Sequence, residues 1–123
     1  MKDSIIEKLD TLSQRLDEIH GLLADPGVAS NQDEFRKLSK EMGELSPVVE
    51  RYRQWEQTNS DLAAARQMLQ EDDEEMREMA AEEARDLEQA NTEHEDALRI
   101  LLIPKDPNDE RNVFLEIRAG TGG

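Results

Sequence analysis

The residues of this sequence that could carry chemistry are mostly carboxylates, and they concentrate in one segment. Between residues 71 and 96 there are thirteen acidic and two basic side chains, a net charge of −11. Two carboxylates act as general acid and base only where their surroundings separate their pKa values, and a polar helical segment provides no such difference. The spacing of an EF-hand calcium loop is also absent. We therefore interpret the segment as a solvated helix face, with an electrostatic surface for a basic protein partner as the alternative.

Two other groups have spacings close to those of functional motifs. Asp17 and His20 have the carboxylate-x-x-His spacing of di-iron helical bundles, but His94 has Asn91 at the corresponding place. The run from Gly120 to Gly123 is rich in glycine but lacks the Gly-Lys-Ser/Thr of a phosphate-binding loop. There is no cysteine, which excludes thiolate metal sites and thiol nucleophiles. We predict no catalytic residue, no metal site and no cofactor.

The basic side chains have one concentration, which consists of Arg36, Lys37, Lys40, Arg51 and Arg53. One interpretation is that these side chains balance neighbouring glutamates along helix faces. The other is that they contact RNA phosphates. We expect any RNA contact to lie here, because the acidic segment should be repelled by phosphates.

The elements that position these residues are predicted to be helices. Apolar residues recur at steps of three and four in four stretches. The first helix begins at Ser4, whose spacing to Glu7 is that of a capping box, and ends at Asp25-Pro26-Gly27. The second begins at Ser30 or Asn31. The third begins at Pro47 after a Ser46 cap, and the fourth runs from Glu74 to Ile103 with Asp73 as its cap. We expect the third and fourth helices to pack antiparallel, with Tyr52 and Trp55 filling the core between helices.

A different pattern follows the fourth helix. Residues 104–111 have the Pro and Asx chemistry of a loop, and 112–118 alternate as a β-strand does. A lone strand is unstable, so we expect its sheet partners beyond Gly123 or on another molecule, and we expect the chain to be a fragment. The predicted fold class is mainly α: a long-helix antiparallel bundle of about four helices with one C-terminal β-strand that belongs to a truncated second domain. The predicted domains are 1–103, a helical N-terminal domain; 104–111, a linker loop; and 112–123, the first strand of that second domain.

Composition sets limits on this fold. The chain has 123 residues and a net charge of −15, with 36% hydrophobic and only 3% aromatic residues. Such a chain suits helices with narrow apolar stripes and large hydrated surfaces. A thin core leaves some apolar surface uncovered, which allows self-association without requiring it. There is no signal peptide and no apolar run that could cross a membrane, so we predict no membrane contact and a cytoplasmic location.

The C-terminal residues carry a specific resemblance. Pro104-Lys105-Asp106-Pro107, Asp109-Glu110-Arg111-Asn112 and Arg118-Ala119-Gly120-Thr121-Gly122-Gly123 are similar to a junction in bacterial class I peptide chain release factors of type 1. Looser similarity extends upstream, for example at Met76-Arg77-Glu78-Met79-Ala80. Type 2 factors share the Ala-Gly-x-Gly-Gly end but lack the Pro-Lys-Asp-Pro loop.

The resemblance implies translation termination. Family members read stop codons with a Pro-x-Thr type tripeptide and release the peptide with a Gly-Gly-Gln loop, and this sequence contains neither motif. It resembles the helical N-terminal domain, and residues from 112 on resemble the start of the decoding domain. The implied partners are the ribosome, at the A site near the large-subunit stalk base, and the GTPase release factor. By this interpretation the chain is a positioning and partner-contact module and not an enzyme, whereas the parent factor triggers peptidyl-tRNA hydrolysis. A helical coiled-coil adaptor or chaperone-like scaffold unrelated to the ribosome is the alternative.

Overall fold

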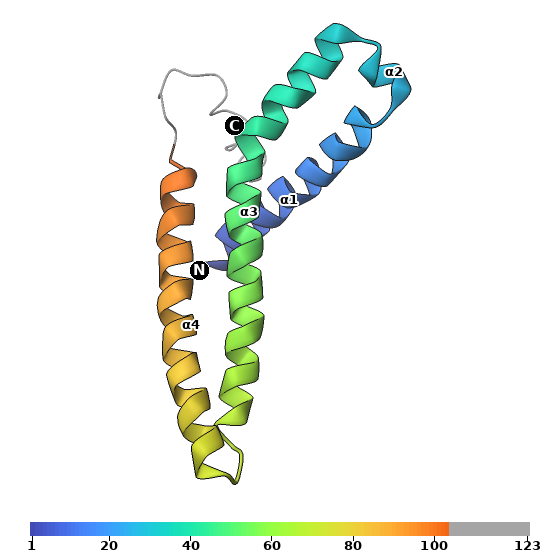
Figure 1. The fold of residues 1–123 in the computed structure, drawn as a ribbon. Coiled ribbons are helices and arrows are strands. Elements are labelled where there is room, and N and C mark those ends of the chain that lie inside the picture. The colour runs from blue at the N-terminus through green and yellow to red at the C-terminus, as the bar shows by residue number, and fades with distance from the viewer. Residues whose placement is uncertain (104–123) are drawn as a thin grey trace. The chain divides into compact units, whose positions relative to one another are not determined.

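The computed structural model describes residues 1–103, and in this part of the chain the regular elements are helices (Figure 1). They are α1 (Asp3–Leu23), α2 (Pro26–Ala29), α3 (Gln32–Met68) and α4 (Glu74–Leu101). The prediction of a mainly α fold is confirmed. The predicted linker at 104–111 and strand at 112–118 lie outside the described residues, so these elements and the domain boundaries stay predictions.

Helix α1 forms because its apolar residues recur on one face. Leu9, Leu12, Leu16 and Ile19 are buried, as the spacing predicts. The predicted start at Ser4 is wrong, because the N-cap is Lys2 and its side chain makes no capping hydrogen bond. Asp3 lies in the first turn, where its negative charge interacts favourably with the helix dipole and stabilises the helix. The helix therefore begins at Asp3, one residue before Ser4.

The turn after α1 contains a short helix that the sequence did not predict. Asp25 is the N-cap of α2, and its carboxylate accepts a hydrogen bond from the Gly27 backbone N–H at 2.8 Å. Pro26 takes the first helical position, which needs no N–H donor. The Asn31 side chain then accepts a hydrogen bond from the Glu34 backbone N–H at 3.2 Å. The next helix begins at Gln32, close to the start predicted at Ser30 or Asn31.

Helix α3 corrects the prediction of two separate helices, because Pro47 lies inside one continuous helix. Pro47 cannot donate to the carbonyl four residues earlier, and an internal proline costs about 3 kcal/mol. Leu45, Val48 and Val49 are all buried around it, and burial of such side chains offsets a cost of this size. Ser46 does not cap a helix, since its hydroxyl donates to the Met42 carbonyl at 2.6 Å. The prediction that a helix begins at Pro47 after a Ser46 cap is therefore wrong.

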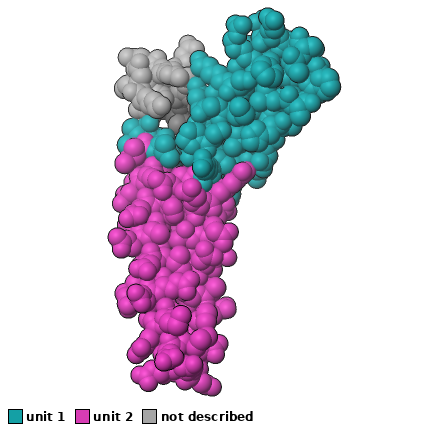
Figure 2. All heavy atoms as spheres, viewed as in Figure 1, with its two compact units in different colours: residues 1–50, 101–123 teal, residues 51–100 magenta. Residues whose placement is uncertain are grey.

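The described residues divide into two compact units (Figure 2). Unit 1 consists of Met1–Glu50 together with residues 101–103, and unit 2 is Arg51–Ile100. Unit 1 contains α1, α2 and the first part of α3. Its core consists mainly of large aliphatic side chains, among them those of α1 and Leu38 and Leu45 of α3. The Arg15 guanidinium on α1 joins Glu41 on α3 through two hydrogen bonds of 2.7 and 2.8 Å.

Unit 2 is an antiparallel hairpin of residues 51–68 of α3 and α4 (Figure 1). Its seam is narrow: Leu62, Ala65 and Ala84 form one buried cluster with Leu87 against it. Asp73 is the cap of α4, as predicted, and its carboxylate accepts from the Glu75 N–H at 3.0 Å. The predicted antiparallel packing of the two helices is confirmed. The predicted end of the last helix at Ile103 is wrong by two residues, because α4 ends at Leu101.

Candidate functional site

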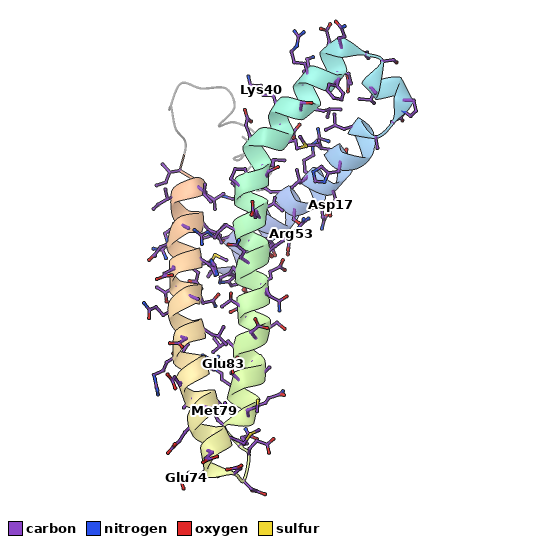
Figure 3. All side chains as sticks on the ribbon, in the orientation of Figure 1. Asp17, Lys40, Arg53, Glu74, Met79 and Glu83 are labelled. Carbon is purple, nitrogen blue, oxygen red and sulfur yellow. The ribbon has the colours of Figure 1, made fainter. Side chains whose placement is uncertain are left out.

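Three of the five predicted contact residues lie close together in unit 1. Arg36, Lys37 and Lys40 are exposed on the first part of α3, and Lys40 is labelled in Figure 3. Arg36 and Lys40 are one helical turn apart and share a face. Phe35, beside Arg36, exposes 43% of its surface. An exposed aromatic ring among cations is a composition found at nucleic-acid surfaces.

The other two predicted residues, Arg51 and Arg53, lie in unit 2 and do not share a face. They are two residues apart, which corresponds to about 200° around a helix. Arg51 Nη1 lies 3.0 Å from His94 Nδ1 on α4, whereas the exposed Arg53 has its own interaction elsewhere. The two arginines therefore cannot meet one ligand surface side by side, and the RNA-contact role of the five residues stays a prediction.

The Arg51–His94 contact fixes the state of the histidine. Because a guanidinium only donates, His94 Nδ1 must be the acceptor and the ring must be neutral. Burial, and then the charge of Arg51, lower the pKa of His94 below its ordinary value of 6.5. His20 is exposed. Within residues 1–103, no group of three His, Asp or Glu side chains is arranged to hold a metal ion.

A series of polar pairs joins the two helices of the hairpin. Beyond Arg51 and His94, Trp55 Nε1 donates to Glu95 Oε2 at 3.0 Å, and Asn91 Nδ2 donates to Asn59 Oδ1. Trp55 also stacks on Tyr52, with ring centroids 5.8 Å apart, and both are buried. The prediction that these aromatic residues fill the core is confirmed. These pairs fix the register of the hairpin, and their polar groups are engaged with one another.

The acidic segment is a solvated face, as predicted. Twelve of its thirteen carboxylate residues are exposed, and the exception is Glu95, the partner of Trp55. Charged groups in water keep their hydration and have no common environment that could separate an acid from a base. This region can attract a basic partner, but it cannot perform acid–base chemistry.

In unit 1, the Arg15–Glu41 pair has a structural function. The hydrogen bonding that Arg15 donates to Glu41, together with the charges of Glu41 and Glu18, raises the pKa of Arg15 above its usual range. Sequence spacing did not indicate this pair, since its members are 26 residues apart. None of the helices within residues 1–103 has the length and apolarity needed to cross a bilayer.

A comparison with models of protein families identifies the family of this chain. The model of the PCRF domain matches residues 12–123 and therefore covers nearly the whole chain. The match includes the helices of both units and the C-terminal residues that carry the resemblance noted in the sequence. The chain belongs to the PCRF domain family, whose domain is part of class I peptide chain release factors.

Proposed function

We propose that this chain is the N-terminal positioning and partner-contact domain of a type 1 release factor. Membership of the PCRF family carries the proposal, because it indicates a release-factor role in translation termination. The assignment to type 1 is supported by the Pro104-Lys105-Asp106-Pro107 loop, because type 2 factors share the Ala-Gly-x-Gly-Gly end but lack this loop.

The domain contributes position and not chemistry. The sequence contains no Gly-Gly-Gln, and the polar pairs Arg51–His94, Trp55–Glu95 and Asn59–Asn91 of unit 2 are engaged across the hairpin. In this proposal the gene product that carries the sequence supplies stop-codon reading and peptidyl-tRNA hydrolysis elsewhere. The helical domain acts in the cytoplasm at the ribosomal A site, near the large-subunit stalk base, and meets the GTPase release factor.

Peptide release from programmed ribosomes tests the proposed function. The gene product should release a labelled peptide from ribosomes with a stop codon in the A site, and not from those with a sense codon. Residues 1–123 alone should release none under either condition. Failure of the gene product to release peptide at a stop codon would refute the release-factor assignment and favour the adaptor alternative.

The basic residues on α3 are the proposed RNA contact within this function. Charge reversal of Arg36 and Lys40 should weaken ribosome binding and lower its salt slope by about one for each lost phosphate contact. Reversal of Arg85 and Arg99, two exposed bases on α4, is the matched control and should leave the slope unchanged.

Reversal of Arg51 and Arg53 separates the two halves of the predicted set. Arg51 faces His94, so its reversal should affect the hairpin as well as any RNA contact. Equal salt slopes for the wild type, the Arg36/Lys40 variant and the Arg51/Arg53 variant would exclude these four residues as phosphate contacts.

A further inference from the structure

The end of the hairpin in unit 2 exposes apolar side chains that the fold leaves uncovered. We define the hairpin tip as residues 68–83, which include the end of α3, the turn and the start of α4. Its exposed large apolar residues are Met68, Leu69, Met76 and Met79. Met79 is 69% exposed although it lies within a regular helix. Apolar side chains gathered in this way on a soluble protein mark an interaction site.

The geometry of α4 surrounds these methionines with carboxylates. On a helix, the neighbours of Met79 are the residues three and four positions away, which are Met76 and the exposed Glu75, Glu82 and Glu83. Glu74, Met79 and Glu83 are labelled on the first turns of α4 in Figure 3. The tip therefore presents an apolar centre with an anionic rim.

The one base within this segment does not neutralise the rim. Residues 71–83 include eight acidic residues and a single basic one, Arg77. The Arg77 guanidinium donates to the backbone carbonyls of Glu71 and Asp72 at 2.8 and 3.0 Å. It thereby holds the turn against α4, and its hydrogen bonds go to backbone groups and not to the carboxylates. The turn is fixed in place while its negative charge remains available to a partner.

We infer that the hairpin tip is a docking surface for a basic amphipathic helix of a partner protein. The inference rests on the partner-contact role proposed above and assigns that role to named residues. Apolar residues of the partner would cover Met76 and Met79, and lysine or arginine side chains would meet the carboxylates around them. Methionine side chains are flexible and suit a helix face of varied shape. Nucleic acid, anionic membranes and a second copy of this tip all carry the wrong charge for this surface.

A designed peptide tests the surface without knowledge of the natural partner. The probe is a helical peptide of leucine and lysine in which the leucines occupy one face. Its controls are a peptide of the same composition with the leucines spread around the helix, and one with glutamate in place of lysine. The leucine–lysine helix should bind this chain, and each control peptide should bind at least about tenfold more weakly. Equal binding of either control would overturn the inference.

Matched variants assign the binding to the tip. M76Q/M79Q replaces two methionines by a side chain of similar length and helix propensity, and should weaken binding of the probe about tenfold. I100Q is the control, because Ile100 is also 69% exposed on α4 but lies outside the tip. The I100Q variant should bind the probe peptide with the affinity of the wild type. Unchanged binding by M76Q/M79Q, with the helix content of the wild type by circular dichroism, would contradict the inference.

Charge variants provide a second test that does not depend on the methionines. E74Q/E75Q/E78Q should weaken binding several-fold and flatten its salt dependence. E50Q/E56Q/E93Q removes the same charge from exposed positions outside the tip and should have less effect. Equal effects of the two triple variants would show that only net charge matters and would overturn the docking site. Peptide release by the gene product is measured separately, so failure of the proposed function is distinguishable from failure of the tip.

Discussion

The two units of this molecule use different means to hold helices together. Unit 1 buries large aliphatic side chains such as Leu9, Leu12 and Ile19, and its ion pair Arg15–Glu41 joins α1 to α3. Unit 2 has a narrow seam of alanines and leucines and a short aromatic stack, and its two helices are linked by a series of polar pairs. Hydrophobic burial gives affinity without direction, whereas hydrogen-bonded pairs require one alignment.

This difference teaches how a chain with few apolar residues can still hold a long hairpin in one register. A narrow seam of alanines and a few leucines buries less surface than a broad core, and it fixes the alignment of the two helices only weakly. Side-chain pairs such as Asn59–Asn91 exist in one register only, in the way that a buried polar residue fixes the register of a coiled coil. If this comparison holds, the stability of unit 1 depends on the volume of its buried side chains, and that of unit 2 on the alignment of its two helices.

The largest effect is expected from a cavity in unit 1. Leu12→Ala removes most of a side chain that is 0% exposed and should lower the free energy of unfolding by about 2–5 kcal/mol. Ile100→Ala, at an exposed position, is the control and should change it by about 0.5 kcal/mol or less. Urea denaturation followed by circular dichroism measures both. A Leu12 variant as stable as the control would show that unit 1 does not depend on its aliphatic core.

The seam of unit 2 should respond to added volume. Ala84 is buried in a cluster with Leu62 and Ala65, so Ala84→Leu should force the helices apart and destabilise the chain by about 1–3 kcal/mol. Ala64→Leu places the same side chain at an exposed position and should be nearly neutral. Urea denaturation measures the free energy of unfolding of both variants. An unchanged value for Ala84→Leu would mean that the seam is not closely packed.

The asparagine pair should show coupling. Asn91 is buried, and its Oδ1 atom has no hydrogen-bond partner within the described part of the chain. Asn59→Ala removes the acceptor of the Asn91 amide and should cost about 1–3 kcal/mol, because a buried donor is then unsatisfied.

A double-mutant cycle separates this coupling from the loss of two side chains. Asn59→Ala/Asn91→Ala should cost less than the sum of the two single variants, with a coupling energy of about 0.5 kcal/mol or more. Additive costs would show that the pair does not contribute to the alignment of the hairpin.

The smallest effect is expected from His94, as a dependence of stability on pH. Its pKa in the folded chain is below 6.5, so the unfolded chain binds more protons near and below pH 6.5. Stability should therefore be full above pH 6.5 and decrease as the pH falls towards the lower, folded pKa. The groups that bear on His94 are Arg51 on α3, which lowers its pKa, and Glu93 on α4, which raises it. His94→Gln should remove this part of the pH dependence, and an identical profile in the variant would exclude His94 as its source.

Sequence spacing predicted the buried face of α1, the cap at Asp73 and the antiparallel hairpin, because each depends on residues near one another along the chain. It failed at Pro47, where buried neighbours outweigh the local signal for a helix start. The pairs Arg51–His94 and Asn59–Asn91 join residues 43 and 32 positions apart. They depend on the register of two helices, which no local pattern contains. For the same reason, the sequence grouped Arg51 and Arg53 although a helix directs them to different sides.

We propose that this domain positions a release factor and does not take part in its chemistry. The direct test is the rate of peptide release by the gene product with and without residues 1–103, measured over a range of factor concentrations. We predict that the deletion raises the concentration needed for half the maximal rate and leaves the rate at saturation nearly unchanged, because only binding and orientation are lost. Loss of release at saturating factor would contradict this account, and so would a deletion that changes neither quantity.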